Sequence, residues 1–334
     1  MIQQILSMIV LNIWFVYTSY GILTPALLIQ QENKINPIIK TVFQSLVVSV
    51  IKFGFLKKNN IYITNELQQT KGKIDILMCN HIGSIDMLLI IAILKSFGIT
   101  NWISIAKSDL MYFPGFGLQF STGDHIKLDR NWNEDQLSIC NQLDKLTEGT
   151  LVIFPEGTRF EPEKLEEGQQ YSKDNNYPVY NHTLVPKSKG LHAVINHLHK
   201  TNKLGSVTDM SIVLKNFFHE KAYMNDLFKK DTGDIFVITR ELKVPILEDQ
   251  TKFKNWLLNE WRKKDDLIDI HTNLAYQKLQ LKRNIMVELV SLLFVIVISY
   301  KLFGSSFRYY FLGSIIVAYA IIYIRRNKHK QASS

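Results

Sequence analysis

The chain has 334 residues, which is enough for one large domain or two small ones with a substantial core. Its formal net charge of +9 suits an acidic partner, but the sequence has no zinc-finger spacing, arginine-rich arm or aromatic-basic repeat, which argues against nucleic acid. An anionic lipid surface or a phosphorylated substrate fits this charge better. The two cysteines, Cys79 and Cys140, do not make a disulfide framework, so we expect a reducing compartment.

The N-terminal region is strongly apolar. Residues 1–31 contain no charged side chain, and residues 5–29 are long enough to cross a bilayer core, which takes about 20 residues. We predict a membrane segment here, although Pro25 leaves open a kink or a re-entrant turn. A second apolar stretch, residues 38–55, is broken by polar side chains and predicts an amphipathic helix on the membrane or an ordinary packed helix.

Short apolar strands alternate with helical patterns from about residue 60. Strands are predicted over residues 61–64, 74–78, 102–106, 126–128, 150–154, 207–214 and 234–241, and helices after Asp86 and over residues 133–146, 188–199 and 251–268. This alternation indicates an α/β fold, which we predict as a mixed sheet flanked by helices. The polar stretch 161–180 predicts a solvated excursion from that fold.

The C-terminal region is apolar again. Residues 289–300 and 309–324 are uncharged and predict a membrane hairpin, although each is short for a span and a re-entrant or interfacial pair stays open. Basic side chains flank both ends of this pair, so the positive-inside tendency places the preceding domain in the cytosol. The predicted division is therefore a membrane segment with an amphipathic helix over residues 1–58, a catalytic domain over 59–275, and a hairpin with a basic tail over 276–334.

The stretch from Asn80 to Asp86 carries the first candidate site. His81 and Asp86 are five residues apart and would diverge on an ideal helix, so they can meet only if Gly83 and Ser84 bend the backbone. In that geometry the carboxylate fixes one imidazole nitrogen while the other removes a proton from a hydroxyl. We interpret His81 as a general base. The alternative is a buried histidine beside a helix-capping aspartate.

A second candidate site follows the apolar run that begins at Leu151. Pro155 ends the predicted strand and Gly157 permits a turn, which leaves Arg159 at the carboxyl end of the strand. Open α/β sheets bind ligands at that end, and a guanidinium binds phosphate with two parallel hydrogen bonds. The alternative for Arg159 is an ordinary surface salt bridge.

Four ordered blocks resemble the glycerophospholipid acyltransferases, a family that includes the lysophosphatidic acid acyltransferases. The blocks are Asn80–Asp86, Gly123–Arg130, Phe154–Arg159 and Leu184–Lys187. The later runs Lys187–Gly190 and Val207–Asp209 look most like the eukaryotic branch that contains lysocardiolipin and lysophosphatidylinositol acyltransferases. The resemblance covers roughly residues 60 to 270 and implies a fold similar to that of glycerol-3-phosphate acyltransferases.

The resemblance implies transfer of a fatty acyl group from acyl-CoA to the free hydroxyl of a lysophospholipid. Acyl-CoA is then a substrate, and we expect neither a cofactor nor a metal. The implied site consists of the catalytic residues His81 and Asp86, the substrate-binding residues Lys127, Arg130, Glu156, Gly157, Thr158 and Arg159, and fourth-block contacts from Val185 and Pro186. Lys127 stands where the family commonly has a bulky apolar residue, which leaves the alignment of that block open.

Two other functions stay open from the sequence. One is a non-catalytic lipid-binding or membrane-organising protein with the same fold, and the other is a thioesterase or phospholipase that uses water as the acceptor. The expected location is the endoplasmic reticulum, as an integral membrane protein with its catalytic domain facing the cytosol. The mitochondrial outer membrane and the lipid droplet remain alternatives.

Overall fold

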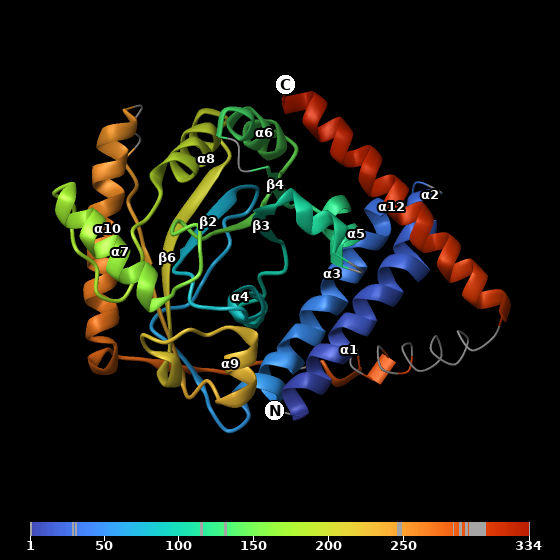
Figure 1. Cartoon of the computed structure of the whole chain (residues 1–334), viewed down its shortest axis with the longest axis horizontal. Helices are drawn as coiled ribbons and strands as arrows, with labels where there is room; N and C mark the ends of the chain where they lie inside the picture. Colours follow the sequence, from blue (N-terminus) through green and yellow to red (C-terminus); the bar gives the residue numbers. More distant parts are fainter. Residues whose placement is uncertain are drawn as a thin grey trace. The chain divides into compact units, whose positions relative to one another are not determined.

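Two groups of residues, interleaved along the chain, each pack mainly against themselves in the computed structural model (Figure 1). The described residues are 2–28, 30, 32–113, 116–129, 132–245, 249–282, 284–286, 289–290, 293 and 305–333. The first unit contains residues 55–104 and 142–281, and the second contains residues 2–54, 105–141 and 282–334. The predicted sequence division at residues 58 and 275 stays a prediction.

The first unit is built on a mixed sheet, whose strands run in the order β3, β5, β2, β6, β7, β1, β8. Their bounds are β1 Ile61–Ile63, β2 Ile74–Cys79, β3 Trp102–Lys107, β5 Gly149–Ile153, β6 Leu204–Leu214, β7 Ile235–Glu241 and β8 Gln277–Leu279. Strands β3, β5, β2 and β6 are parallel, whereas β6 and β7 are antiparallel, as are β1 and β8. Every residue of β2 and β5 is buried, as expected for apolar strands covered on both faces.

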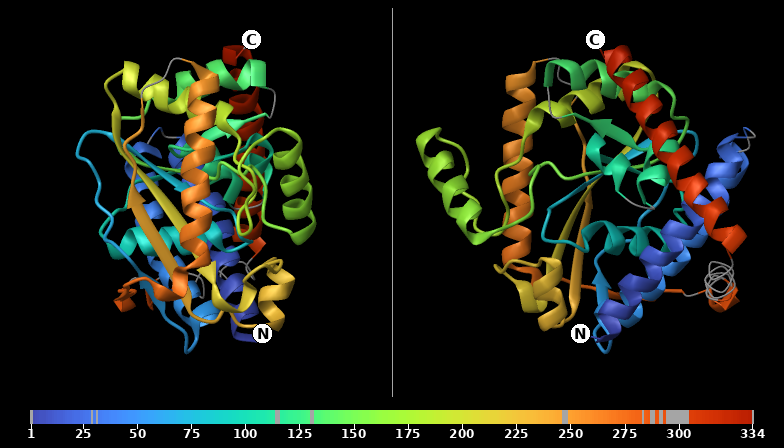
Figure 2. Two further views of the ribbon diagram at one scale, coloured as in Figure 1. Left: turned by 90° about the vertical axis from the view of Figure 1, so that its left-hand side faces the viewer. Right: turned by 45° about the vertical axis from the view of Figure 1, so that its right-hand side comes forward.

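The helices of this unit cover both faces of the sheet. They are α4 Asp86–Ser96, α7 Pro162–Asp174, α8 Ser188–Lys200, α9 Met224–Lys229 and α10 Gln250–Asp269. The crossover from β2 to β3 and the crossover from β5 to β6 run in opposite directions along the sheet. Because such crossovers are right-handed, α4 and α8 lie on opposite faces. Figures 1 and 2 likewise show α10 beside β6, on the side away from α4.

The second unit is mainly helical. Its elements are α1 Ile2–Thr18, the π-helical turn η1 Ser19–Leu23, α2 Thr24–Leu28, α3 Glu32–Ser49 with the π-helical turn η2 Val50–Leu56, η3 Ser108–Tyr112, α5 Phe116–Thr122, β4 Ile126–Leu128, α6 Trp132–Asp144 and α12 Ser305–Ser333. Ring stacking between Trp14 and Phe43 joins α1 to α3, with centroids 6.2 Å apart. Tyr20 of η1 meets Phe311 of α12 edge to face at 6.0 Å. Aromatic contacts thus join helices that are far apart in sequence.

The predicted α/β fold with a mixed sheet is confirmed, and each predicted strand and helix between residues 61 and 268 is present with ends shifted by a few residues at most. The prediction missed α7, which lies inside the polar stretch 161–180 and begins at Pro162, a favourable residue for the first helical position. Its residues are mostly polar and its helical surface is solvated, so no apolar periodicity marks it in the sequence.

The membrane predictions have a mixed outcome. Residues 5–28 are helical with a π-helical turn at Ser19–Leu23, but among the described residues the one helix long and apolar enough to cross a membrane is Lys34–Leu56. That helix covers the stretch predicted as amphipathic. The second C-terminal stretch, residues 309–324, lies within α12. Most of the first stretch, 289–300, and the Lys301–Gly304 connection lie outside the described residues.

A buried ion network ties α10 to the sheet of the first unit. The ammonium of Lys264 is fully buried and donates to Asp209 Oδ1 and to the carbonyl of Met210, each at 2.7 Å. Arg240 Nε donates to the other oxygen of Asp209 at 2.9 Å, and Arg240 also pairs with Glu260 at 2.9 Å. Strands β6 and β7 and helix α10 therefore meet around one buried carboxylate, whose burial requires these partners.

Replacing Lys264 by methionine should destabilise the first unit, because Asp209 then keeps a buried charge with one cation fewer. We expect the free energy of unfolding to fall by roughly 3 kcal/mol or more. The neighbouring Lys263→Met is the matched control: Lys263 is 62% exposed and its ion pair within the described part of the chain is with Glu260, so its loss should cost less than about 1 kcal/mol. Denaturant titration in mild detergent, followed by tryptophan fluorescence, measures both. Equal midpoints for the two variants would contradict this account.

Candidate active site

The first candidate site begins at the end of β2, where a side chain replaces the backbone as the hydrogen-bond partner of β6. Asn80 follows the last residue of β2, and its amide Nδ2 donates to the carbonyl of Ile212 on β6 at 2.9 Å. Its Oδ1 accepts from the amide nitrogen of Ile212 at 2.8 Å. The side chain thus satisfies the neighbouring strand while the backbone of residue 80 is free to turn. The next residue, His81, leaves the sheet at its carboxyl edge.

Gly83 provides the bend that the sequence required. It forms an isolated β-bridge with Ala222, and a Cβ at residue 83 would lie 2.2 Å from the carbonyl oxygen of Ala222. The amide nitrogen of Ser84 donates to that same oxygen at 3.0 Å. Only glycine allows two backbones to approach this closely. A segment almost 140 residues away therefore holds the bend.

The predicted contact between His81 and Asp86 is present. His81 Nδ1 lies 2.7 Å from Asp86 Oδ2, and the amide nitrogen of Gly83 donates to both carboxylate oxygens at 3.0 Å. Asp86 is buried, which raises its pKa, whereas the hydrogen bonds from His81 and Gly83 act in the opposite direction and favour the carboxylate. Phe154 stacks on the imidazole with ring centroids 4.3 Å apart. The ring is thus fixed at one nitrogen and on one face, and Nε2 is the nitrogen that Asp86 does not engage.

Glu156 supports the same turn from the end of β5. Its buried Oε2 accepts from the amide nitrogen of His81 at 3.2 Å, and its carboxyl group also accepts from the backbone of Leu184. Burial raises the pKa of Glu156 to about 8, so this carboxyl group is mainly protonated at neutral pH. Its Oε1 is buried without a hydrogen-bond partner among the described residues. Glu156 therefore holds the backbone of His81 rather than supplying a negative charge.

Gly157 lets the fourth sequence block approach the third. It has a φ of +69°, in the left-handed region that favours glycine, and its amide nitrogen donates to the carbonyl of Phe154 at 3.0 Å. A Cβ at residue 157 would lie 3.2 Å from the ammonium of Lys187. The amide nitrogen of Lys187 in turn donates to the carbonyl of Pro155 at 2.8 Å. The ammonium of Lys187 therefore lies against the turn that ends in Arg159.

Arg159 carries a charge that no carboxylate offsets in the part of the chain described here. Its Nη1 donates to the hydroxyl of Ser84 at 3.1 Å, and its guanidinium carbon lies 5.0 Å from the centroid of the Tyr223 ring. The side chain is exposed. Two nearby lysines, Lys164 and Lys221, pair with carboxylates instead. A cation held by a hydroxyl and a ring face keeps its charge for an anionic ligand.

The remaining predicted contacts differ in their placement. Thr158 accepts a hydrogen bond from Lys164 at 2.9 Å through its hydroxyl. Val185 and Pro186 lie in the segment that runs beside Pro155, and Pro186 is buried. Lys127 belongs to β4 in the second unit, where its ammonium lies 5.9 Å from the centroid of the Phe120 ring. Arg130 lies outside the described residues.

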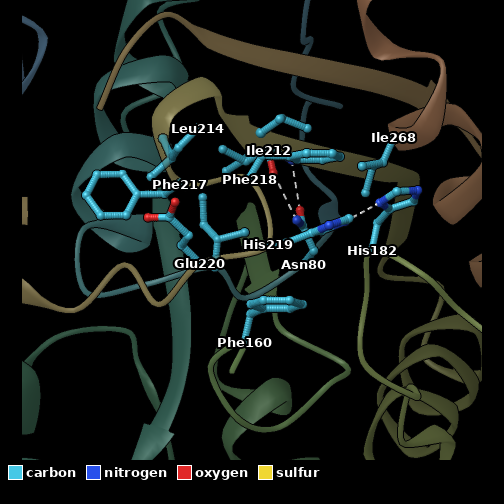
Figure 3. Close-up of a pocket in the computed structure, with 12 residues that line it drawn as sticks. Asn80, Phe160, His182, Ile212, Leu214, Phe217, Phe218, His219, Glu220 and Ile268 are labelled. Carbon is cyan, nitrogen blue, oxygen red and sulfur yellow. Dashed lines mark hydrogen bonds between the residues drawn. The ribbon is translucent and has the colours of Figure 1, made fainter. Parts of the chain in front are cut away.

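A pocket adjoins the turn (Figure 3). Its walls are mainly apolar, and its lining consists of Asn80, Ile82, Phe160, His182, Ile212, Val213, Leu214, Phe217, Phe218, His219, Glu220 and Ile268. Phe160 links the pocket to the site because its amide nitrogen donates to the carbonyl of His81 at 2.6 Å. On the opposite wall, His182 Nδ1 and His219 Nε2 are 2.6 Å apart and share a hydrogen bond. A small apolar group fits such a lining better than a charged one.

The sequence interpretation missed Ala222, Tyr223 and Lys187 as neighbours of the site. Lys187 stood inside a recognised block and was the only one of the three with a signal in the sequence. Ala222 and Tyr223 belong to the connection between η4 Lys215–Phe217 and α9, which has no motif of its own. Only the fold brings them to the turn.

Comparisons with known proteins agree with the sequence blocks. Residues 60–215 match the family model described as Acyltransferase. The Probable 1-acyl-sn-glycerol-3-phosphate acyltransferase 5 of Arabidopsis thaliana is 23% identical over 228 residues, which cover 66% of this chain and 60% of that protein. The human 1-acyl-sn-glycerol-3-phosphate acyltransferase delta is 26% identical over 197 residues, or 57% and 51% of the two chains.

A solved structure is also similar. The 1-acyl-sn-glycerophosphate (LPA) acyltransferase PlsC of Thermotoga maritima aligns with a TM-score of 0.47 and 16% identity, covering 80% of this chain and 98% of that one. The chain spans about three fifths of the length of the first curated relatives it matches. The resemblance predicted from the four blocks is confirmed: the region from residue 60 to residue 215, which carries His81, Asp86 and Arg159, matches the acyltransferase family model and is similar to proteins named as acyltransferases.

Proposed function

We propose that this protein is a membrane-bound acyltransferase that moves a fatty acyl group from acyl-CoA to the free hydroxyl of a lysophospholipid. The observation that carries the proposal is the 2.7 Å contact between His81 Nδ1 and Asp86 Oδ2 at the carboxyl edge of the sheet. The relatives cited above are named 1-acyl-sn-glycerol-3-phosphate acyltransferases, and these names support a lysophosphatidic acid type of acceptor and a role in phospholipid biosynthesis.

His81 acts as the general base in this proposal. With Nδ1–H donating to Asp86, Nε2 carries the lone pair that removes the proton from the acceptor hydroxyl as its oxygen attacks the thioester carbonyl carbon. The tetrahedral intermediate then expels the CoA sulfur, and the proton on Nε2 returns to it as the carbon–sulfur bond breaks. The carboxylate of Asp86 stabilises the imidazolium between these two steps. No covalent acyl-enzyme is needed, and the hydroxyl of Ser84 accepts a hydrogen bond from Arg159 instead.

Arg159 binds the phosphate of the acceptor in this proposal. Its exposed guanidinium keeps a full charge and hydrogen-bond donors for a ligand, since its partners among the described residues are a hydroxyl and a ring face. Two residues shape the turn that presents Arg159. Glu156 accepts a hydrogen bond from the backbone amide of His81, and Gly157 adopts a left-handed backbone conformation. A thioesterase would share the base but use water. Consumption of labelled acyl-CoA that depends on added lysophospholipid distinguishes the two reactions.

Replacing His81 by alanine should reduce acyl transfer by at least about a hundredfold, because general-base catalysis contributes on the order of 10² or more. Asp86→Asn should be nearly as severe, since a neutral amide does not stabilise the imidazolium. Initial rates with labelled acyl-CoA and lysophosphatidic acid measure both variants. His199→Ala is the matched control because His199 is an exposed histidine on α8. Activity of His81→Ala within about tenfold of wild type would remove His81 from the chemistry.

Replacing Arg159 by alanine should chiefly raise the KM for the lysolipid. Phosphate contacts made in both the ground state and the transition state contribute uniform binding, which changes KM more than kcat. Arg159→Lys should recover only part of the loss, because an ammonium lacks the planar fork of donors. The surface pair of Arg262 with Asp266 provides a control arginine, and Arg262→Ala should leave KM unchanged. An unchanged lysolipid dependence in Arg159→Ala would move the acceptor site elsewhere.

The membrane orientation can be tested separately from the chemistry. Basic residues flank the terminal apolar stretches on the side of the catalytic domain, so we propose that this domain faces the cytosol, where acyl-CoA is made available. On intact microsomes, tags inserted near Gln170 and after Ser334 should both be cleaved by added protease, and Asn181 should carry no glycan. Protection of the Gln170 tag, or a glycan on Asn181, would reverse the orientation.

A further inference from the structure

The ring of Tyr223 forms one side of the environment of Arg159. The guanidinium carbon lies 5.0 Å from the ring centroid, within the range of a cation–π contact. In the described part of the chain, Nη1 of this side chain also donates to the hydroxyl of Ser84 at 3.1 Å. Both partners are neutral, so they restrict the guanidinium without offsetting its charge.

Tyr223 is itself fixed at three points. Its hydroxyl donates to Glu161 Oε1 at 2.6 Å, and its amide nitrogen donates to Asp226 Oδ2 at 3.2 Å, at the start of α9. The preceding residue, Ala222, forms the bridge with Gly83 that holds the catalytic turn. The ring is therefore positioned by the same backbone contact that bends the chain between His81 and Asp86.

Glu161 remains a charged anchor for the Tyr223 hydroxyl across the physiological range. Its hydrogen bond from Lys164, together with that from Tyr223, lowers the pKa of Glu161 to about 2. The neighbouring cations Lys164 and Lys221 both contact this carboxylate, and Lys221 also contacts Glu163. The charges of these two lysines are thus offset by the neighbouring carboxylates, in contrast to the charge of Arg159.

We propose that Tyr223 is the positioning residue that orients Arg159 toward the phosphate of the acceptor, and that it thereby sets the affinity for a phosphate-bearing acceptor. The inference rests on the proposed function because it assigns the ligand of Arg159. A restrained guanidinium loses less conformational freedom on binding, which increases affinity without a new contact to the ligand. Tyr223 does not touch the reacting atoms, so its effect belongs in binding rather than in the chemical step.

The test separates the ring of Tyr223 from its hydroxyl. Tyr223→Leu removes the ring face and should raise both the KM and the equilibrium Kd for lysophosphatidic acid by roughly threefold to thirtyfold, the range of a lost cation–π contact. Its kcat should stay within about threefold of wild type. Tyr223→Phe keeps the ring face and should stay within about twofold in Kd. Tyr171 is an exposed tyrosine on α7 whose ring is tilted against that of Tyr177, so Tyr171→Leu is the matched control and should change neither constant.

A double-mutant cycle then tests whether Tyr223 acts through Arg159. In the Arg159→Ala background, Tyr223→Leu should cause no further rise in the Kd for lysophosphatidic acid, because the group it positions is gone. Additive effects would overturn the proposal, as would a fall in kcat with KM and Kd unchanged, or an equal loss in Tyr223→Phe and Tyr223→Leu.

The outcome also distinguishes this inference from the proposed function. If the wild-type protein binds lysophosphatidic acid without acylating it, the proposed reaction fails while the Kd series still decides the role of Tyr223. If the wild-type protein does not bind lysophosphatidic acid at all, both fail.

Discussion

The buried carboxylate of Asp86 is the group on which the candidate site depends. A charge inside a sheet edge is tolerated only when its oxygens accept hydrogen bonds, and here both oxygens accept from Gly83 while one also contacts His81. Satisfying the carboxylate requires the chain to fold back over five residues. That reversal turns the imidazole toward Phe154 and leaves Nε2 as the nitrogen that Asp86 does not engage. The geometry of the proposed base is thus a consequence of how a buried charge is satisfied.

Three of the buried carboxyl groups in the first unit have different hydrogen-bond partners, and this difference separates their roles. Asp209 is held by two cations and joins helix α10 to strands β6 and β7. Among the described residues Glu156 accepts from the backbone amides of His81 and Leu184, and its pKa, raised to about 8 by burial, makes it a mainly neutral support for the His81 backbone. Asp86 contacts the imidazole of His81, the side chain that acts as the general base in the proposed reaction.

The sequence predicted what is encoded locally and missed what depends on long-range pairing. Apolar runs identified the parallel strands, and the spacing of His81, Gly83 and Asp86 defined the bend that a contact between His81 and Asp86 requires. By contrast, Asn80 pairs with Ile212 and Gly83 with Ala222 across more than 130 residues of chain. No local pattern encodes such a partner, because the sheet order alone decides which strand end lies beside β2. The proximity of Tyr223 to Arg159 could not be predicted from the sequence for the same reason.

The loop that supplies Tyr223 also forms a wall of the pocket, so one loop contacts both the pocket and the turn that carries His81. His219 has a φ of +61°, which is uncommon for a residue with a side chain. This conformation costs free energy, so it persists only where contacts with the surrounding structure offset the cost. Its ring stacks on Phe218 at 4.2 Å and shares a hydrogen bond with His182, whose other nitrogen lies 3.2 Å from Asp269. Three residues later the same loop reaches Gly83 through Ala222. Ring contacts in the pocket wall therefore hold the positive-φ backbone of His219, and the same loop contacts the turn that presents the imidazole through Ala222.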